Sequence, residues 1–234
     1  MSTDEEKQKL LSSALIAAGI VVILWVVKAI EAAFGISLVS FGIQPLTAEG
    51  LKGIIFSPLI HGSMAHLISN SVPFFLLAAA LFYYYRTHAW TIFLLSWLVT
   101  GFWTWIFARG SSYHIGASGV VYALATFHFV SGIIRKEPKL IAFTLLVTFL
   151  YGSFVWGIFP DFALKERISW ESHLMGMIAG LVLAFTYRSI GPQRKVYEWP
   201  EEEDEDESND QDNNSPQNTF TINYTPKEQS PDKD

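Results

Sequence analysis

Residues 10–27 read LLSSALIAAGIVVILWVV, a run of 18 residues without one charged side chain. A transmembrane helix needs about 20 apolar residues, because it must cross about 30 Å of hydrocarbon and satisfy its backbone polar groups internally. The run therefore predicts a transmembrane helix. The whole chain agrees, since 50% of its 234 residues are hydrophobic and only 16% are charged, which is too apolar for a soluble domain of this length.

Five further charge-free windows follow this run along the chain. They lie between Lys52 and Arg86, Arg86 and Arg109, Arg109 and Arg135, Lys139 and Asp161, and Glu171 and Arg188. The first of them is too long for one span, so we expect its helix near Met64 to Tyr85, after an apolar loop that lies partly in the interfacial layer. The sequence thus predicts an all-α membrane protein: a bundle of six transmembrane helices with a partly membrane-embedded first loop.

The acidic net charge of −6 comes from one end of the chain. Residues 198–234 hold 2 Lys and 13 Asp or Glu and carry −11, whereas residues 1–197 carry +5. The acidic end has too few apolar residues to offset the entropy of ordering, so we expect a disordered, solvated tail rather than a docking segment. The predicted organisation is a cytoplasmic N-terminus (1–9), a six-helix transmembrane domain (10–190) and an acidic cytoplasmic tail (191–234).

The distribution of Lys and Arg predicts the orientation of the helices. With six spans, nine Lys or Arg residues lie on the side of the two termini and five lie on the other side. Basic residues are concentrated in cytoplasmic loops. Both termini are therefore expected in the cytoplasm, and the second, fourth and sixth spans are expected to begin at the outer face.

Polar side chains gather at the start of those three spans. The motifs are His66-Leu67-Ile68-Ser69-Asn70, Gly116-Ala117-Ser118-Gly119 and His173-Leu174-Met175-Gly176. Ionisable side chains are costly within a membrane and usually functional. The chain has no cysteine, so disulfides, thiolate metal sites and cysteine nucleophiles are excluded. Any covalent chemistry must use oxygen.

The three motifs supply the parts of a serine nucleophile site. Ser118 opens a helix, where unpaired N–H groups and the helix dipole favour a developing anion. A serine hydroxyl needs a base to take its proton, and His173 is the candidate general base and acid. His66 and Asn70 are four residues apart and share a helical face. With the backbone N–H groups of Ala117 and Ser118, they are candidate donors to an oxyanion.

Small residues and one aromatic residue support this arrangement. Gly116 and Gly119 leave room for a substrate backbone beside the candidate nucleophile. Gly176 and Gly180 form a small-xxx-small face that favours a close approach of the fourth and sixth spans. Tyr122 lies one turn after the candidate nucleophile, where its ring is placed to stack on the imidazole of the base.

These residues, together with one more histidine in the first loop, make the chain resemble the rhomboid intramembrane serine proteases from about residue 10 to residue 190. The matching residues are His61, His66, Asn70, Gly116, Ser118, Gly119, Tyr122, His173, Gly176 and Gly180. Many rhomboids carry a Trp-Arg pair in the first loop, and none lies between Glu31 and Ser63. How this loop is anchored is therefore left open.

The resemblance implies a minimal six-helix, bacterial-type enzyme of the inner membrane whose site opens toward the outer face. It implies a Ser118-His173 dyad without a third acidic residue, which cuts peptide bonds in or near the transmembrane segments of other membrane proteins. The expected partners are these protein substrates and the lipid bilayer. No cofactor, metal or nucleic acid is expected.

Several alternatives stay open at this point. Two other functions are possible: a catalytically inactive rhomboid-like protein that binds membrane clients, and a small transporter. The alternative role for His66 and Asn70 is to hold the first loop in place. His61 is expected to form a hydrogen bond with the backbone of that loop. His114 is expected to face the outer interface. Phe154 and Trp156 are expected to belong to an interfacial aromatic belt rather than to a substrate gate.

Overall fold

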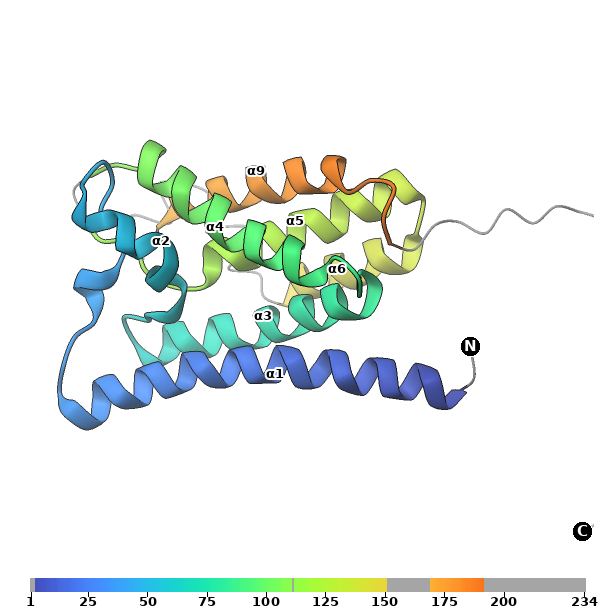
Figure 1. Ribbon diagram of the computed structural model, residues 1–234, viewed down its shortest axis with the longest axis horizontal. Coiled ribbons are helices and arrows are strands. Elements are labelled where there is room, and N and C mark those ends of the chain that lie inside the picture. The colour runs from blue at the N-terminus through green and yellow to red at the C-terminus, as the bar shows by residue number, and fades with distance from the viewer. Residues whose placement is uncertain (1–2, 111, 151–168, 192–234) are drawn as a thin grey trace, which may run out of the picture. The chain divides into compact units, whose positions relative to one another are not determined.

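The computed structural model describes residues 3–110, 112–150 and 169–191. In these ranges the chain is helical, apart from turns, loops and one isolated bridge between Ile43 and His114. The elements in chain order are α1 (Thr3–Phe34), η1 (Val39–Phe41), η2 (Glu49–Lys52), α2 (Gly53–Phe56), η3 (Ser57–Leu59), α3 (Met64–Tyr84), α4 (Ala89–Phe107), α5 (Ser118–Arg135), α6 (Pro138–Leu150) and α9 (Trp170–Thr186) (Figure 1).

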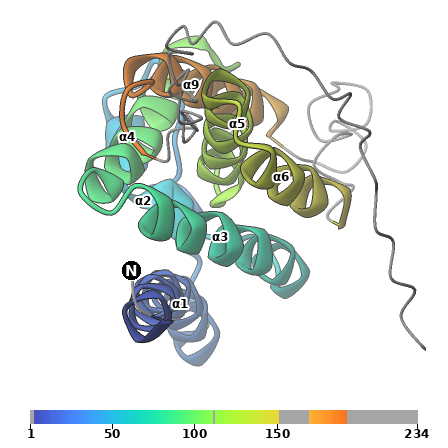
Figure 2. The same cartoon turned by 90° about the vertical axis from the view of Figure 1, so that its right-hand side faces the viewer.

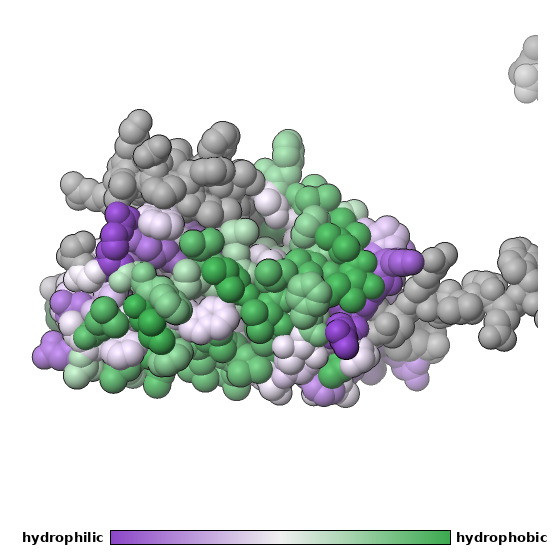
Figure 3. Space-filling model, turned by 90° about the horizontal axis from the view of Figure 1, so that it is seen from above, coloured by the Kyte–Doolittle hydropathy of each residue, from purple (hydrophilic) through white to green (hydrophobic). Residues whose placement is uncertain are grey.

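Four of these helices are long and apolar enough to cross a membrane: α1, α3, α4 and α5. The apolar helices α6 and α9 are shorter, with 13 and 17 described residues. Apolar residues cover the middle of the face seen in Figure 3, and hydrophilic residues lie mostly toward its two ends. The protein is thus a multi-pass membrane protein. The count of six spans stays a prediction, and part of the expected fifth span lies outside the described residues.

The boundaries of α3 follow from local sequence. Ser63 is extended, with φ −149° and ψ 165°, and its side chain accepts a hydrogen bond from the backbone N–H of His66 at 3.1 Å. A serine cap of this kind satisfies one of the unpaired donors at a helix start. The helix ends at Tyr84, just before Arg86. The predicted extent, Met64 to Tyr85, is confirmed to within one residue.

Helix α5 is the centre of the bundle, because it contacts α3, α4, α6 and α9, whereas α1 packs on α3 (Figure 2). Its contact with α9 is backbone to backbone. A Cβ atom at Gly176 would lie 2.1 Å from the carbonyl oxygen of Gly119, and one at Gly180 would lie 2.1 Å from that of Ala123. Only glycine permits this separation, so the start of α9 lies directly against the start of α5.

The first loop is held against α4 by tryptophan side chains. Trp97 Nε1 donates to the carbonyl oxygens of Ile54 and Ile55 at 3.2 and 3.1 Å, and Trp105 Nε1 donates to that of Thr47 at 2.9 Å. These bonds join backbone carbonyl groups of the loop to side chains of α4. The loop therefore lies along α4.

The same loop is tied to α1 by the ion pair of Lys28 and Glu31, near the end of that helix. Glu31 is buried and accepts a hydrogen bond from the backbone N–H of Leu38 at 2.8 Å. Lys28 Nζ lies 3.1 Å from the Glu31 carboxylate and donates to the carbonyl of His61 at 2.8 Å. The anchoring that the sequence left open thus comes from Lys28 and Glu31 on one side and from two tryptophans of α4 on the other.

Two further sequence expectations lie outside the described residues. They concern Phe154 and Trp156 as members of an aromatic belt, and the acidic tail beyond Gly191.

Candidate active site

Ser118 and His173 meet at one end of the bundle. Ser118 is the first residue of α5, and His173 lies in the first turn of α9. His173 Nε2 lies 2.8 Å from Ser118 Oγ, which is hydrogen-bond distance. When the imidazole carries its proton on Nδ1, the Ser118 hydroxyl donates to Nε2. This is the geometry in which an imidazole can remove a hydroxyl proton.

Tyr122 fixes the plane of the imidazole. Its ring centroid lies 4.3 Å from that of His173, and the two ring planes are 21° apart. Tyr122 stands four residues after Ser118 on α5, so both project from one face of the helix. The tyrosine ring therefore lies beside the contact between the hydroxyl and the imidazole, and it limits how the imidazole can turn.

The start of α9 is tied to the loop that precedes α5. Arg109 Nε lies 2.7 Å from Glu171 Oε1, and the Arg109 guanidinium lies over the Trp170 ring at 5.3 Å from its centroid. His114 Nδ1 is hydrogen-bonded to the hydroxyl of Ser169. These contacts lie within four residues of the candidate base. The sequence did not predict them, because Arg109 and His114 stand in a loop without a periodic pattern.

The expectation that His114 faces the outer interface is wrong. Its side chain is 4% exposed, and its backbone forms the bridge with Ile43. Burial lowers the pKa of His114, while its hydrogen bond to the Arg109 carbonyl acts in the opposite direction. The structural reason for the burial is that residues 112–117 fold back against the first loop, where the backbone of Ile43 pairs with that of His114 at 2.8 and 2.9 Å.

His66 lies against the backbone just before Ser118. Gly116 has a φ of 108°, and a Cβ atom there would lie 2.7 Å from the His66 ring. Glycine is therefore required at this position both for its left-handed backbone and for the imidazole beside it. Asn70 is buried, and its Nδ2 donates to the His66 carbonyl at 2.8 Å. The structure thus brings His66 to the glycine-serine motif and places Asn70 one turn further along α3.

His61 and the first loop bind the backbone of the same motif. The N–H of Ala117 donates to His61 Nε2 at 3.4 Å, and the N–H of Gly116 donates to the Ser57 carbonyl at 2.9 Å. Burial lowers the pKa of His61 to about 3, and the nearby His66 and Lys28 act in the same direction. The ring is therefore neutral near pH 7, as it must be to accept the Ala117 N–H.

A Rhomboid domain family model matches residues 48–190 of this chain. The uncharacterized proteins Rv1337 of Mycobacterium tuberculosis and Mb1372 of Mycobacterium bovis are each 32% identical over 185 residues, which cover 75% of this chain and 74% of the relative. The uncharacterized protein ML1171 of Mycobacterium leprae is 30% identical over 179 residues, which cover 74% of this chain and 70% of the relative.

Proposed function

This chain belongs to the rhomboid family, and we propose that it is an intramembrane serine endopeptidase that cleaves peptide bonds in or near the transmembrane segments of other membrane proteins. The observation that carries the proposal is the 2.8 Å between His173 Nε2 and Ser118 Oγ. A hydroxyl at a helix amino terminus in contact with an imidazole is the arrangement that nucleophilic catalysis requires.

The proposed reaction has two stages. His173 Nε2 takes the proton of the Ser118 hydroxyl as Oγ attacks the scissile carbonyl carbon, whose oxygen becomes an oxyanion. When this intermediate collapses, the C–N bond breaks and the imidazolium gives its proton to the leaving amine. A water molecule, activated by His173 in the same way, then hydrolyses the acyl-enzyme ester and restores the serine.

The proposed oxyanion donors are the backbone N–H of Ser118 and the side chains of His66 and Asn70. The position of His66 against Gly116 supports its part in this set. The N–H of Ala117 belongs to the set only after it leaves His61, because it donates to that ring here at 3.4 Å. Preorganised donors of this kind contribute about 3 kcal/mol each to the stabilisation of a transition state.

We propose that the base works as a dyad. Glu171 stands two residues before His173, and residues at this spacing do not share a helical face. Its Oε1 lies 2.7 Å from Arg109 Nε. The stacked ring of Tyr122 orients His173 instead. The glycines Gly119, Gly176 and Gly180 act indirectly, since they allow α9 to bring its histidine to the start of α5.

The proposed topology has six spans, both termini in the cytoplasm and a site that opens toward the outer face of a bacterial inner membrane. The excess of Lys and Arg on the side of the termini supports this orientation. The first loop fits an interfacial position, because it exposes Phe41, Leu46, Leu51, Ile55 and Phe56. Water would reach the scissile ester from the outer side.

A serine-directed probe tests this function against an inactive, client-binding rhomboid. The full-length protein in mild detergent is treated with a fluorophosphonate, and the modified residue is located by mass spectrometry. We expect labelling of Ser118, loss of that labelling in His173→Ala and retention of it in Ser12→Ala, a half-buried serine of α1 that serves as the control. Absence of labelling in the folded wild-type protein favours the inactive binder.

A further inference from the structure

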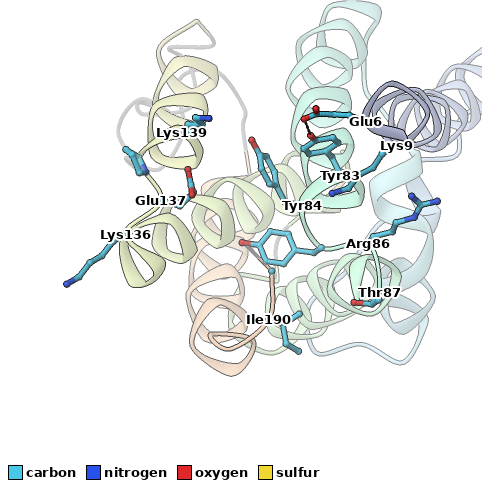
Figure 4. Close-up of a pocket in the computed structure, with 13 residues that line it drawn as sticks. Glu6, Lys9, Tyr83, Tyr84, Arg86, Thr87, Lys136, Glu137, Lys139 and Ile190 are labelled. Atoms are coloured by element: carbon cyan, nitrogen blue, oxygen red, sulfur yellow. Dashed lines mark hydrogen bonds between the residues drawn. The ribbon is translucent and has the colours of Figure 1, made fainter. Parts of the chain in front are cut away.

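A cavity of about 1150 Å³ is lined by the residues drawn in Figure 4. It lies where α3 and α5 end, whereas Ser118 and His173 stand at the starts of α5 and α9. Its walls come from the start of α1, the end of α3, the turn between α5 and α6, and the residues that follow α9. The volume lies slightly above the range for small-molecule sites, about 300–1,000 Å³. It is far larger than a single inorganic ion requires.

The lining of this cavity is cationic. Lys9, Arg86, Lys136 and Lys139 line it, against two carboxylates, Glu6 and Glu137. Glu6 accepts a hydrogen bond from the Tyr83 hydroxyl at 3.1 Å. Within the described ranges, the ion pairs are Lys28–Glu31 and Arg109–Glu171, so the four cations of the cavity have no ion-pair partner there. Their charge is available to an anion.

Two lysines are placed to bind one ligand together. In Figure 4, Lys9 and Lys139 extend toward the same space from opposite walls, and the Tyr84 hydroxyl lies between them in this view, whereas Lys136 points outward. The Lys9 ammonium lies over the Tyr83 ring at 4.4 Å from its centroid. This contact steadies the lysine and leaves N–H donors for a second partner.

The floor of the cavity is held by a buried arginine. Arg135 donates to the Tyr85 hydroxyl at 2.9 Å, to the Tyr187 carbonyl at 2.6 Å and to the Ile190 carbonyl. Tyr85 and Ile190 both line the cavity. The end of α3 and the residues after α9 are therefore fixed to one side chain of α5, and the cavity keeps its form without a ligand.

The position of the cavity on the molecule favours a lipid headgroup over a free anion as its ligand. Three consecutive tyrosines, Tyr83 to Tyr85, stand where α3 ends, and tyrosine is enriched at membrane–water interfaces. Next to Lys9, Leu10 and Leu11 are exposed by 59% and 61%, which offers an apolar surface to an acyl chain. Basic pockets between transmembrane helices on the cytoplasmic side bind anionic headgroups.

We propose that this cavity binds a phosphate-bearing anion, presented by the headgroup of an anionic membrane lipid. The proposal rests on the topology proposed above, which turns the cavity toward the cytoplasmic leaflet. The Lys9 and Lys139 ammonium groups bind the phosphate from two sides, the Tyr84 hydroxyl donates to it, and the acyl chains lie along the exposed leucines of α1.

The test measures ligand-dependent thermal stability of the full-length protein in a neutral detergent. Short-chain phosphatidylglycerol, short-chain phosphatidylcholine and inorganic phosphate are titrated separately, and the midpoint of unfolding gives an apparent affinity. The test variant is Lys9→Gln/Lys139→Gln. The matched control is Lys7→Gln/Lys52→Gln, which also removes two charges; Lys52 lies over the Phe41 ring at 4.8 Å much as Lys9 lies over Tyr83, and neither control lysine lines the cavity.

We expect phosphatidylglycerol to stabilise the wild type and the control equally, and the loss of two cations to weaken its apparent affinity in the test variant by about 30-fold. Phosphatidylcholine should have no comparable effect. Equal responses of the test and control variants would overturn the site, and a full response to inorganic phosphate alone would overturn its assignment to a lipid. If the double variant does not fold, Lys139→Gln alone should weaken binding about fivefold.

This measurement is independent of the proposed protease activity. It needs no cleavage and no substrate, so it can be repeated in the Ser118→Ala background. A wild type that cleaves its substrate but is not stabilised by phosphatidylglycerol overturns the lipid site alone. A wild type that is stabilised by the lipid but does not cleave overturns the protease alone.

Discussion

Gly176 packs directly on the backbone of Gly119: a Cβ atom at residue 176 would lie 2.1 Å from the Gly119 carbonyl oxygen. The residue lies one turn after His173 on α9, and Gly119 follows Ser118 on α5. The separation of these two helices therefore sets the distance between the imidazole and the hydroxyl. Any side chain at residue 176 must move one helix away from the other.

Gly176→Ala should accordingly destabilise the protein by about 1–3 kcal/mol, the usual cost of overpacking, and should lower the cleavage rate about 100-fold, since a displacement of about 1 Å has that effect in an active site. Gly19→Ala is the matched control, because a Cβ atom at Gly19 has nothing within 4 Å. Thermal unfolding and cleavage rates check both. Wild-type cleavage by Gly176→Ala would contradict the role of this contact.

Tyr122 should act on catalysis through its ring. Tyr122→Ala removes the ring stacked at 4.3 Å on His173, and a contact of this kind contributes about 0.5–1.5 kcal/mol. We expect a loss of cleavage rate of roughly 3- to 10-fold, mainly in kcat. Tyr122→Phe keeps the ring and should lose less. Equal losses in the two variants would show that the hydroxyl, not the ring, is what matters.

Glu171→Gln distinguishes a dyad from a triad. The ion pair with Arg109 joins a carboxylate that is 10% exposed to a guanidinium that is 58% exposed, so its loss should cost about 1 kcal/mol or less and lower cleavage less than about tenfold. Arg109→Gln should give a similar effect. If Glu171 were the third member of a triad, its loss would reduce kcat by about 10⁴, and Arg109→Gln would not match it.

The stability of the protein should decrease as the pH is lowered, because of His61. Burial lowers its pKa from 6.5 to about 3 in the folded state. The unfolded chain therefore binds a proton that the folded chain excludes, so stability is complete above pH 6.5 and is lost as the pH falls from 6.5 toward 3. At pH 5 this loss is about 2 kcal/mol.

The variant His61→Gln isolates this effect, because glutamine does not titrate and its carbonyl oxygen can accept the Ala117 N–H. Burial also lowers the pKa of His114, which remains in both proteins. Unfolding midpoints measured from pH 7.5 to pH 5 should fall more steeply in the wild type than in His61→Gln. Parallel curves would show that His61 does not contribute.

The sequence predicted the meeting of Ser118 and His173 for a physical reason. The helices that carry them, α5 and α9, were expected to begin at a similar depth, and each has small residues at four-residue spacing. Close packing of these small residues brings the two amino-terminal ends together. The boundaries of α3 were predictable because Arg86 and the capping Ser63 mark them. In each case the signal is local in sequence or periodic.

The contacts of the loops could not be predicted in this way. The pairing of Arg109 with Glu171 and the burial of His114 join segments about 60 residues apart, and no period relates them. The hydrogen bond from Ala117 to His61 likewise depends on the path of the first loop. Apolar windows alone do not fix the number of spans either, because α9 has 17 residues, the lower end of the range for a transmembrane helix.

The most direct test of the account is cleavage of a single-span substrate by the purified protein in lipid vesicles. The wild type is compared with Ser118→Ala and His173→Ala, with folding checked by thermal unfolding. The account predicts cleavage by the wild type and none above background by either variant, because each lacks one partner of the 2.8 Å contact. Cleavage by either variant at the wild-type rate would contradict it.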